Sequence, residues 1–201
     1  MAPRLIASNL TGFPDNFHPN GKIATVAFID ASNEVICIIE SFGRLFSPIV
    51  SDMRGNANRL LAHYKEDEKG RQFIEDMILS DNTRLTHTWL LWLKRALEMM
   101  ERFFWLLLNS EEIVKEKSEN IKPCITLAYD DVLKPYHGFF LQNASKLIYR
   151  CVPSRSSLLG TGADFQENIK QLRLLQPRMK RHVEKINHLY RDNGLNDQER
   201  V

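Results

Sequence analysis

Residues 83–109, TRLTHTWLLWLKRALEMMERFFWLLLN, form the longest apolar stretch of the 201-residue chain. Such a stretch is long enough to cross a bilayer, which needs about 20 mostly apolar residues. Charges at that depth, however, cost about 2.5–3.5 kcal/mol each on insertion scales. The stretch therefore predicts the central helix of a globular protein, with one charged stripe facing water. That stripe consists of Lys94, Arg95, Glu98, Glu101 and Arg102.

Apolar residues also recur with a helical period in all the remaining long segments of the chain. The run VICII at residues 35–39 is also compatible with a strand, so both readings stay open there. Pro135 is expected to kink its helix or to separate two helices, and Pro177 is expected to divide the last helical segment into a pair. Residues 154–165 are expected to form a loop. The pattern predicts seven or eight helices that form an all-α bundle in two layers. Besides the central helix, we expect helices over residues 23–42, 51–64, 70–79, 124–149 and 163–190.

Length and composition are typical of one globular domain covering residues 1–201. We expect residues 1–21 to form an irregular lead-in and residues 192–201 to form a frayed polar tail. A net charge of +2 is too small to indicate a nucleic-acid partner. The three cysteines are odd in number and lack metal-ligand spacing, which predicts reduced thiols in a cytoplasmic protein. We expect no cofactor and no bound metal.

Residues 51–64, SDMRGNANRLLAHY, combine a polar and an apolar helix face. Asp52, Asn56 and Arg59 fall at positions i, i+4 and i+7, which share one side of a helix. We expect this helix to begin at Ser51 or Asp52, just after a proline. Taken alone, these side chains are more often a helix cap and a solvated surface. Together they also place a carboxylate, an amide and a guanidinium where a polar ligand can bind.

Three segments, in this order and at these separations, resemble the glycolipid transfer protein family. They are residues 47–64 (SPIVSDMRGNANRLLAHY), 90–97 (LLWLKRAL) and 127–140 (LAYDDVLKPYHGFF), and the similarity covers about residues 25–190. The resemblance implies a two-layer all-α sandwich of about eight helices, with an apolar pocket for lipid chains between the layers. It also implies a non-enzymatic carrier that moves glycosphingolipids between membranes.

The resemblance assigns a role to five side chains. Asp52 looks like the acid that accepts a hydrogen bond from the ceramide amide, and His137 like the residue that donates to its carbonyl. Asn56 and Arg59 look like contacts to sugar hydroxyl groups, although the family often has Lys at the second position. Trp92 looks like the platform on which the first sugar ring stacks. An amide has one donor and one acceptor, so an acid and an imidazole suit it as a pair.

Apolar contacts with the lipid and the membrane are expected as well. Two lipid chains would gain about 0.8 kcal/mol per buried methylene, which requires a dry pocket. The family commonly has Trp after its His-Gly pair, whereas this chain has Phe139. We expect transient membrane contact through Phe139, with electrostatic support from Lys146 and Arg150. Candidate pocket residues are Phe42, Phe46, Ile49, Met99 and Phe103.

The headgroup is expected to be a neutral sugar of the glucosyl-, galactosyl- or lactosylceramide class. In the phosphoceramide-binding branch of the family, cations occupy the positions of Asn56, Trp92 and Thr88. A phosphate site without those cations would lose much of its charge pairing. A ceramide-1-phosphate carrier and a sphingolipid sensor that signals through a partner protein remain alternatives. A hydrolase is disfavoured because no GxSxG, HExxH or P-loop motif is present.

Overall fold

The computed structural model describes residues 10–195 and 198–201. This part of the chain forms nine α-helices, two short 3₁₀ helices and one isolated antiparallel bridge, between Ala24 and Phe73. The prediction of an all-α sandwich is therefore confirmed. The helices are α1 (Thr25–Glu40), η2 (Arg44–Phe46), α2 (Ser47–Glu66), α3 (Ile74–Leu79), α4 (Leu85–Asn109), α5 (Glu111–Val114), α6 (Lys122–Val132), η3 (Lys134–Tyr136), α7 (Phe139–Tyr149), α8 (Arg155–Leu159) and α9 (Gly162–Asp192).

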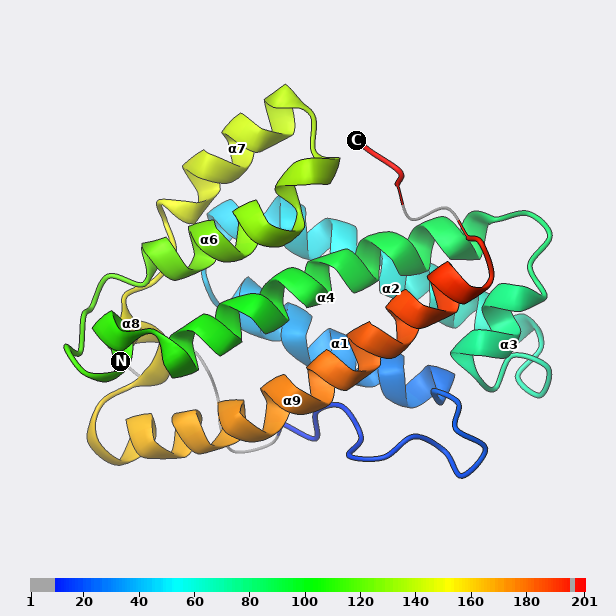
Figure 1. Cartoon of the computed structure of the whole chain (residues 1–201), viewed down its shortest axis with the longest axis horizontal. Helices are drawn as coiled ribbons and strands as arrows, with labels where there is room; N and C mark the ends of the chain where they lie inside the picture. Colours follow the sequence, from blue (N-terminus) through cyan, green and yellow to red (C-terminus); the bar gives the residue numbers. More distant parts are fainter. Residues whose placement is uncertain (1–9, 196–197) are drawn as a thin grey trace.

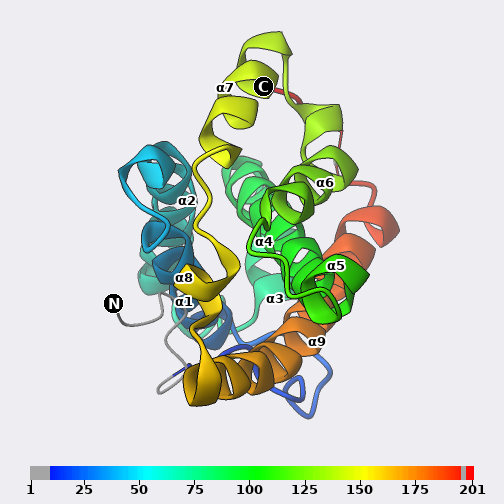
Figure 2. The same cartoon turned by 90° about the vertical axis from the view of Figure 1, so that its left-hand side faces the viewer.

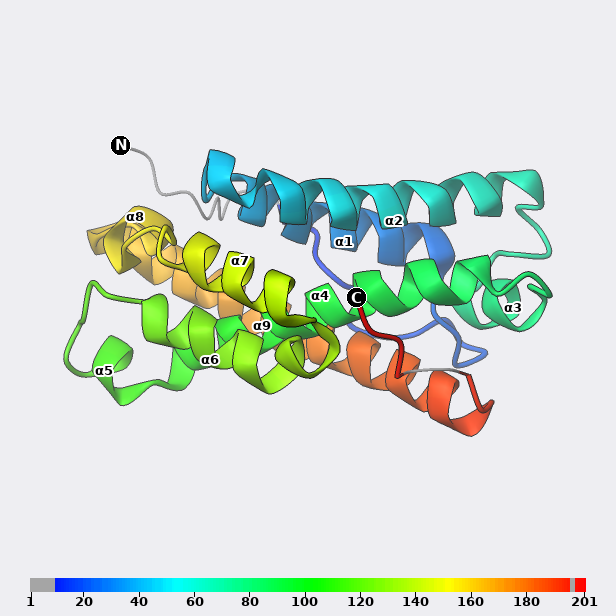
Figure 3. The same cartoon turned by 90° about the horizontal axis from the view of Figure 1, so that it is seen from above.

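Helix α4 is the centre of the fold, as its apolar sequence predicts (Figure 1). It packs against α2 on one side and against α6 and α9 on the other. Seen end-on, α1 and α2 lie to the left, α4, α5 and α6 to the right, and α9 along the lower edge (Figure 2). The view from above shows the same separation, with α1 and α2 beside each other (Figure 3). No helix of the described part is long and apolar enough to cross a membrane.

The first two long helices differ in detail from the prediction. Helix α1 is continuous, so the strand alternative for residues 35–39 is wrong. Helix α2 begins at Ser47 and not at Ser51 or Asp52. Pro48 lies in its first turn, where the missing N–H of proline would have had no helical acceptor. Asp52 therefore lies in the second turn and does not cap the helix.

The two interior prolines have opposite effects. Pro135 lies in η3 and separates α6 from α7, which divides the long helix predicted there. Pro177 does not divide α9, so that part of the prediction is wrong. Proline has no N–H, so the carbonyl of Arg173, four residues earlier, loses its helical hydrogen bond. Both residues are exposed, so water can bind that carbonyl instead. Leu175 and Met179 are buried on the inner side and hold the helix against the core.

The loop predicted at residues 154–165 is also wrong, because it contains α8 and the start of α9. The side chain of Ser154 caps α8 by accepting a hydrogen bond from the N–H of Ser157 at 3.2 Å. Leu158 and Leu159 are fully buried. The sequence therefore contains a cap followed by an apolar pair, which is the local signal of a short helix.

The segments at the two ends of the chain are anchored. Residues 10–21 are irregular, as expected, but Phe13 is fully buried and Glu34 of α1 accepts hydrogen bonds from the N–H groups of Thr11 and Gly12. The expected frayed tail is wrong for residues 198–201, which hydrogen-bond to α4 and to residues 136–138. At the start of the predicted tail, Asp192 ends α9 and Leu195 packs against the core. Residues 1–9 and 196–197 lie outside the described residues.

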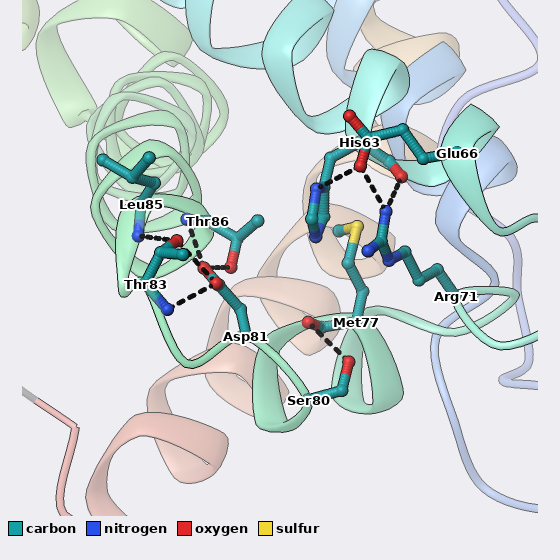
Figure 4. Close-up of polar contacts among 9 residues, drawn as sticks. All are labelled: His63, Glu66, Arg71, Met77, Ser80, Asp81, Thr83, Leu85 and Thr86. Atoms are coloured by element: carbon teal, nitrogen blue, oxygen red, sulfur yellow. Dashed lines mark hydrogen bonds and ion pairs between the residues drawn. The ribbon is translucent and has the colours of Figure 1, made fainter.

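A polar network fixes the turn between α3 and α4 (Figure 4). One Asp81 oxygen accepts from the N–H and hydroxyl of Thr83, at 2.8 and 2.6 Å. The other accepts from the N–H and hydroxyl of Thr86, at 2.9 and 2.5 Å. Burial alone would raise the pKa of Asp81, but these hydrogen bonds hold it far below its usual value. Arg84, at the N-cap position, makes no side-chain cap, so Asp81 takes that role for α4.

We expect Asp81→Ala to lower the free energy of unfolding by about 1–2 kcal/mol, the usual cost of losing a helix cap. Because the pKa of Asp81 is lower in the folded state, its stabilisation is present in full above the unfolded pKa of about 3.9 and declines as the pH falls below it. Urea unfolding of both proteins across that range measures the effect. Asn82→Ala, at an exposed position in the same turn, is the control. An equal loss in both variants would contradict the capping role.

Candidate functional site

The polar row predicted on α2 is present. Asn56 donates to an Asp52 carboxylate oxygen at 3.4 Å, and Arg59 donates to the Asn56 carbonyl oxygen at 3.3 Å. Asn56 is buried, while Asp52 and Arg59 remain accessible to solvent. Neighbouring protein atoms displace part of the hydration of Asp52 and raise its pKa, and Arg59 works in the opposite direction. The hydrogen-bonded row holds an acceptor, an amide and a cation in fixed order on one helix face.

Trp92 and His137 form an aromatic pair across two elements. Their ring centroids are 6.1 Å apart at an interplanar angle of 27°, although the residues are far apart in sequence. The Tyr129 hydroxyl lies 3.3 Å from Nδ1 of His137, and a phenol that donates there leaves Nε2 to carry the ring hydrogen. Burial, and then the charge of Arg95, lower the pKa of His137. The imidazole is therefore neutral near neutral pH and offers one N–H donor.

Arg95 is a side chain next to these residues that sequence reasoning placed wrongly. The charged stripe predicts that Lys94 and Arg95 face water, but both are buried, with Arg95 only 1% exposed. The Arg95 guanidinium lies 4.7 Å from the ring centroid of Trp92 and 3.5 Å from that of Tyr136. It also donates to the backbone carbonyl of Glu199 at 2.8 Å. A weakly hydrated, planar cation suits such a stack. Its spacing from Trp92, three residues on the same helix, is the signal that could have found it.

The described end of the tail pairs with the segment that carries His137. The N–H of Val201 donates to the Tyr136 carbonyl at 3.0 Å, and the N–H of Gly138 donates to the Val201 carbonyl at 2.5 Å. These two bonds lie on either side of His137 in the sequence. The backbone of the tail therefore helps to fix the position of the imidazole.

The residues expected to line a lipid pocket lie in the packed core. Phe42 contacts Phe46 and Phe103 with ring centroids 5.2 and 6.3 Å apart, and all three rings are buried. Met99 is buried as well and accepts a hydrogen bond from Tyr149, whereas Ile49 is only partly buried. The side chains that sequence reasoning grouped are therefore neighbours, and in this structure they fill the space between them.

Helix α7 carries the predicted membrane-contact residues at one edge of the molecule (Figures 1 and 2). Phe139 is 74% exposed and its neighbour Phe140 is 87% exposed. Lys146 and Arg150 are exposed on the same helix and its C-cap. Two adjacent solvent-exposed phenyl rings are an unusual apolar surface for a protein that stays in water.

The hydrogen-bonding groups around Lys94 form a second polar region. A cavity of about 270 Å³ is lined by charged and polar side chains from α4, η3 and α9. Its Lys94 donates to Asn187 at 2.6 Å and to Glu98 at 3.2 Å. Such walls do not suit hydrocarbon chains. Among the residues that the structure describes, no group of His, Cys, Asp and Glu could hold a metal ion.

Solved structures share this fold. The GLTP-fold structure of FAPP2, described as selecting simple glycosphingolipids, has a TM-score of 0.84 at 21% identity and covers 97% of this chain and 99% of that one. The mouse ceramide-1-phosphate transfer protein has a TM-score of 0.82 at 17% identity and covers 96% and 97%. At these identities the similarity establishes the helical fold and not the ligand.

Sequence comparison identifies the family. The glycolipid transfer protein of Xenopus tropicalis is 26% identical over 148 residues, which cover 69% of this chain and 70% of that protein. The glycolipid transfer protein of Danio rerio is 28% identical over 151 residues, with coverage of 69% and 70%. The family model described as glycolipid transfer protein (GLTP) matches residues 23–164. Because this match spans more than half of the sequence, the chain belongs to the glycolipid transfer protein family, whose members are lipid transfer proteins.

Proposed function

We propose that this protein is a non-enzymatic carrier of glycosphingolipids between membranes, with the whole chain acting as one transfer domain. The observations that carry the proposal are the stacked Trp92–His137 pair and the hydrogen-bonded row on α2. The two groups lie on or next to helices that pack against each other, α2 and α4. Their chemistry matches a ceramide amide joined to a sugar.

Each group has a partner in such a lipid. The Asp52 carboxylate accepts from the ceramide amide N–H, and Nε2–H of neutral His137 donates to the amide carbonyl. Asn56 and Arg59 bind sugar hydroxyl groups, and the accessible part of the half-buried Trp92 ring packs against the apolar C–H side of the first sugar. No residue is required to break a covalent bond, which suits a carrier rather than a hydrolase.

The lipid chains would enter the core near Phe42, Phe46 and Phe103. These rings now contact one another, so chain entry must separate them. Methylene groups of the lipid then pack against each ring in place of its neighbour, so the core stays apolar and dry in both states. Ring movement of this kind makes uptake depend on a membrane that supplies the lipid directly. A glycosphingolipid sensor would need the same site and would differ by slow transfer despite tight binding.

We expect the protein to transfer glucosyl- or galactosylceramide between vesicles, and Asp52→Val or Trp92→Ala to slow transfer at least about tenfold, since each removes a headgroup contact. The matched controls are Asp30→Val, at an exposed position on α1, and Trp105→Ala, at a half-exposed position on α4. Circular dichroism and melting temperature verify folding. Transfer of ceramide-1-phosphate alone would contradict the sugar headgroup, and tight binding without transfer would favour a sensor.

We expect Phe140→Ala to reduce binding to neutral phosphatidylcholine vesicles about tenfold, because a phenyl group that enters the interface gains about 1.5–3 kcal/mol. The melting temperature should not change, since the ring is 87% exposed. Vesicle co-sedimentation measures the partitioning. Leu79→Ala removes an apolar side chain that is 52% exposed on α3, away from α7. Equal losses in both variants would show that α7 is not the docking surface.

A further inference from the structure

Glu199 contacts α4 on both sides of Trp92, at Thr88 and at Arg95. Thr88, Trp92 and Arg95 fall at positions i, i+4 and i+7 and therefore share one helix face. The Glu199 carboxylate accepts from the Thr88 hydroxyl at 3.2 Å, and its backbone carbonyl accepts from Arg95 at 2.8 Å. One tail residue thus contacts the helix a turn before and a turn after the tryptophan. Figure 3 shows the tail passing over α4.

The backbone carbonyl and the side-chain carboxylate of Glu199 make different contacts. The backbone carbonyl of Glu199, together with the paired backbone of Val201, fastens the tail to Arg95 and to residues 136–138. The carboxylate binds a different group of α4, the Thr88 hydroxyl, at 3.2 Å. The residue is only partly buried, so a carboxylate oxygen can meet a ligand at the site.

We propose that the Glu199 carboxylate is a selectivity residue of the headgroup site: it accepts hydrogen bonds from sugar hydroxyl groups and disfavours a phosphate. This inference rests on the proposed glycosphingolipid function. A carboxylate accepts from hydroxyl donors but repels a phosphate, which carries negative charge and few donors.

The nearby cations do not offset this repulsion. The Arg95 guanidinium is buried between two aromatic rings and donates to the tail, while Arg59 donates to Asn56. Asp52 adds a second carboxylate to the proposed site. With Arg95 buried, the two carboxylates of Asp52 and Glu199 stand against one accessible guanidinium, that of Arg59, whereas a sugar brings several hydroxyl donors that can use those acceptors.

The test compares glucosylceramide with ceramide-1-phosphate of the same acyl length, in vesicle transfer and in binding, for wild type, Glu199→Gln and Glu199→Lys. Gln keeps the shape and can still accept from Thr88, but it lacks the charge. We expect wild type to prefer glucosylceramide. The preference should fall about threefold in the Gln variant and about tenfold or more in the Lys variant, and added salt should weaken the Lys effect. Glu68→Lys, exposed in the turn after α2, makes the same charge change elsewhere.

The outcomes separate the two proposals. If wild type carries glucosylceramide but neither Glu199 variant changes the preference more than Glu68→Lys does, the carboxylate is not a selectivity residue and the carrier function stands. If wild type carries neither lipid, or only ceramide-1-phosphate, both proposals are overturned. Melting temperatures establish that each variant folds. If the Lys variant does not fold, the isosteric Gln variant still decides the test.

Discussion

The arrangement of the candidate site depends on the contacts of the buried Arg95 guanidinium. It lies against Trp92 of α4 and Tyr136 of η3, and it holds the backbone of the tail at Glu199. Three segments distant in sequence are thereby fixed around one cation. A buried charge is costly unless it is paired, so removing any one of its contacts would affect the others. The position of His137 follows, because it adjoins Tyr136 and stacks on Trp92.

The core presents a different constraint, since under the proposed function the same apolar side chains must both stabilise the fold and admit a lipid. The Phe42, Phe46 and Phe103 rings meet at edge-to-face geometry. Contacts between aromatic and aliphatic groups are exchangeable, because burial of apolar area is not directional. Hydrogen bonds instead fix the row on α2 and the Asp81 turn that starts α4.

Much of the fold and of the site could be predicted from periodicity and motif. The spacing of Asp52, Asn56 and Arg59 placed them on one helix face, and the structure links them by hydrogen bonds. The apolar run around Leu90–Leu97 predicted the central helix, because only burial on several sides tolerates that composition. Local signals were misjudged where tertiary contacts outweighed them: α9 continues through Pro177 because its inner face is buried and its broken bond faces water.

The sequence by itself determined most of the long helices, the apolar core and the identity of the motif residues, because these depend on propensity and on spacing along the chain. The tertiary structure decided which charged residues are buried and what the tail does. The sequence places Arg95 in a solvated stripe, whereas the fold buries it against Tyr136 and Glu199. Nothing in a polar run such as QERV indicates a partner more than a hundred residues away. Contacts of that kind depend on the packing of whole helices, which local sequence does not encode.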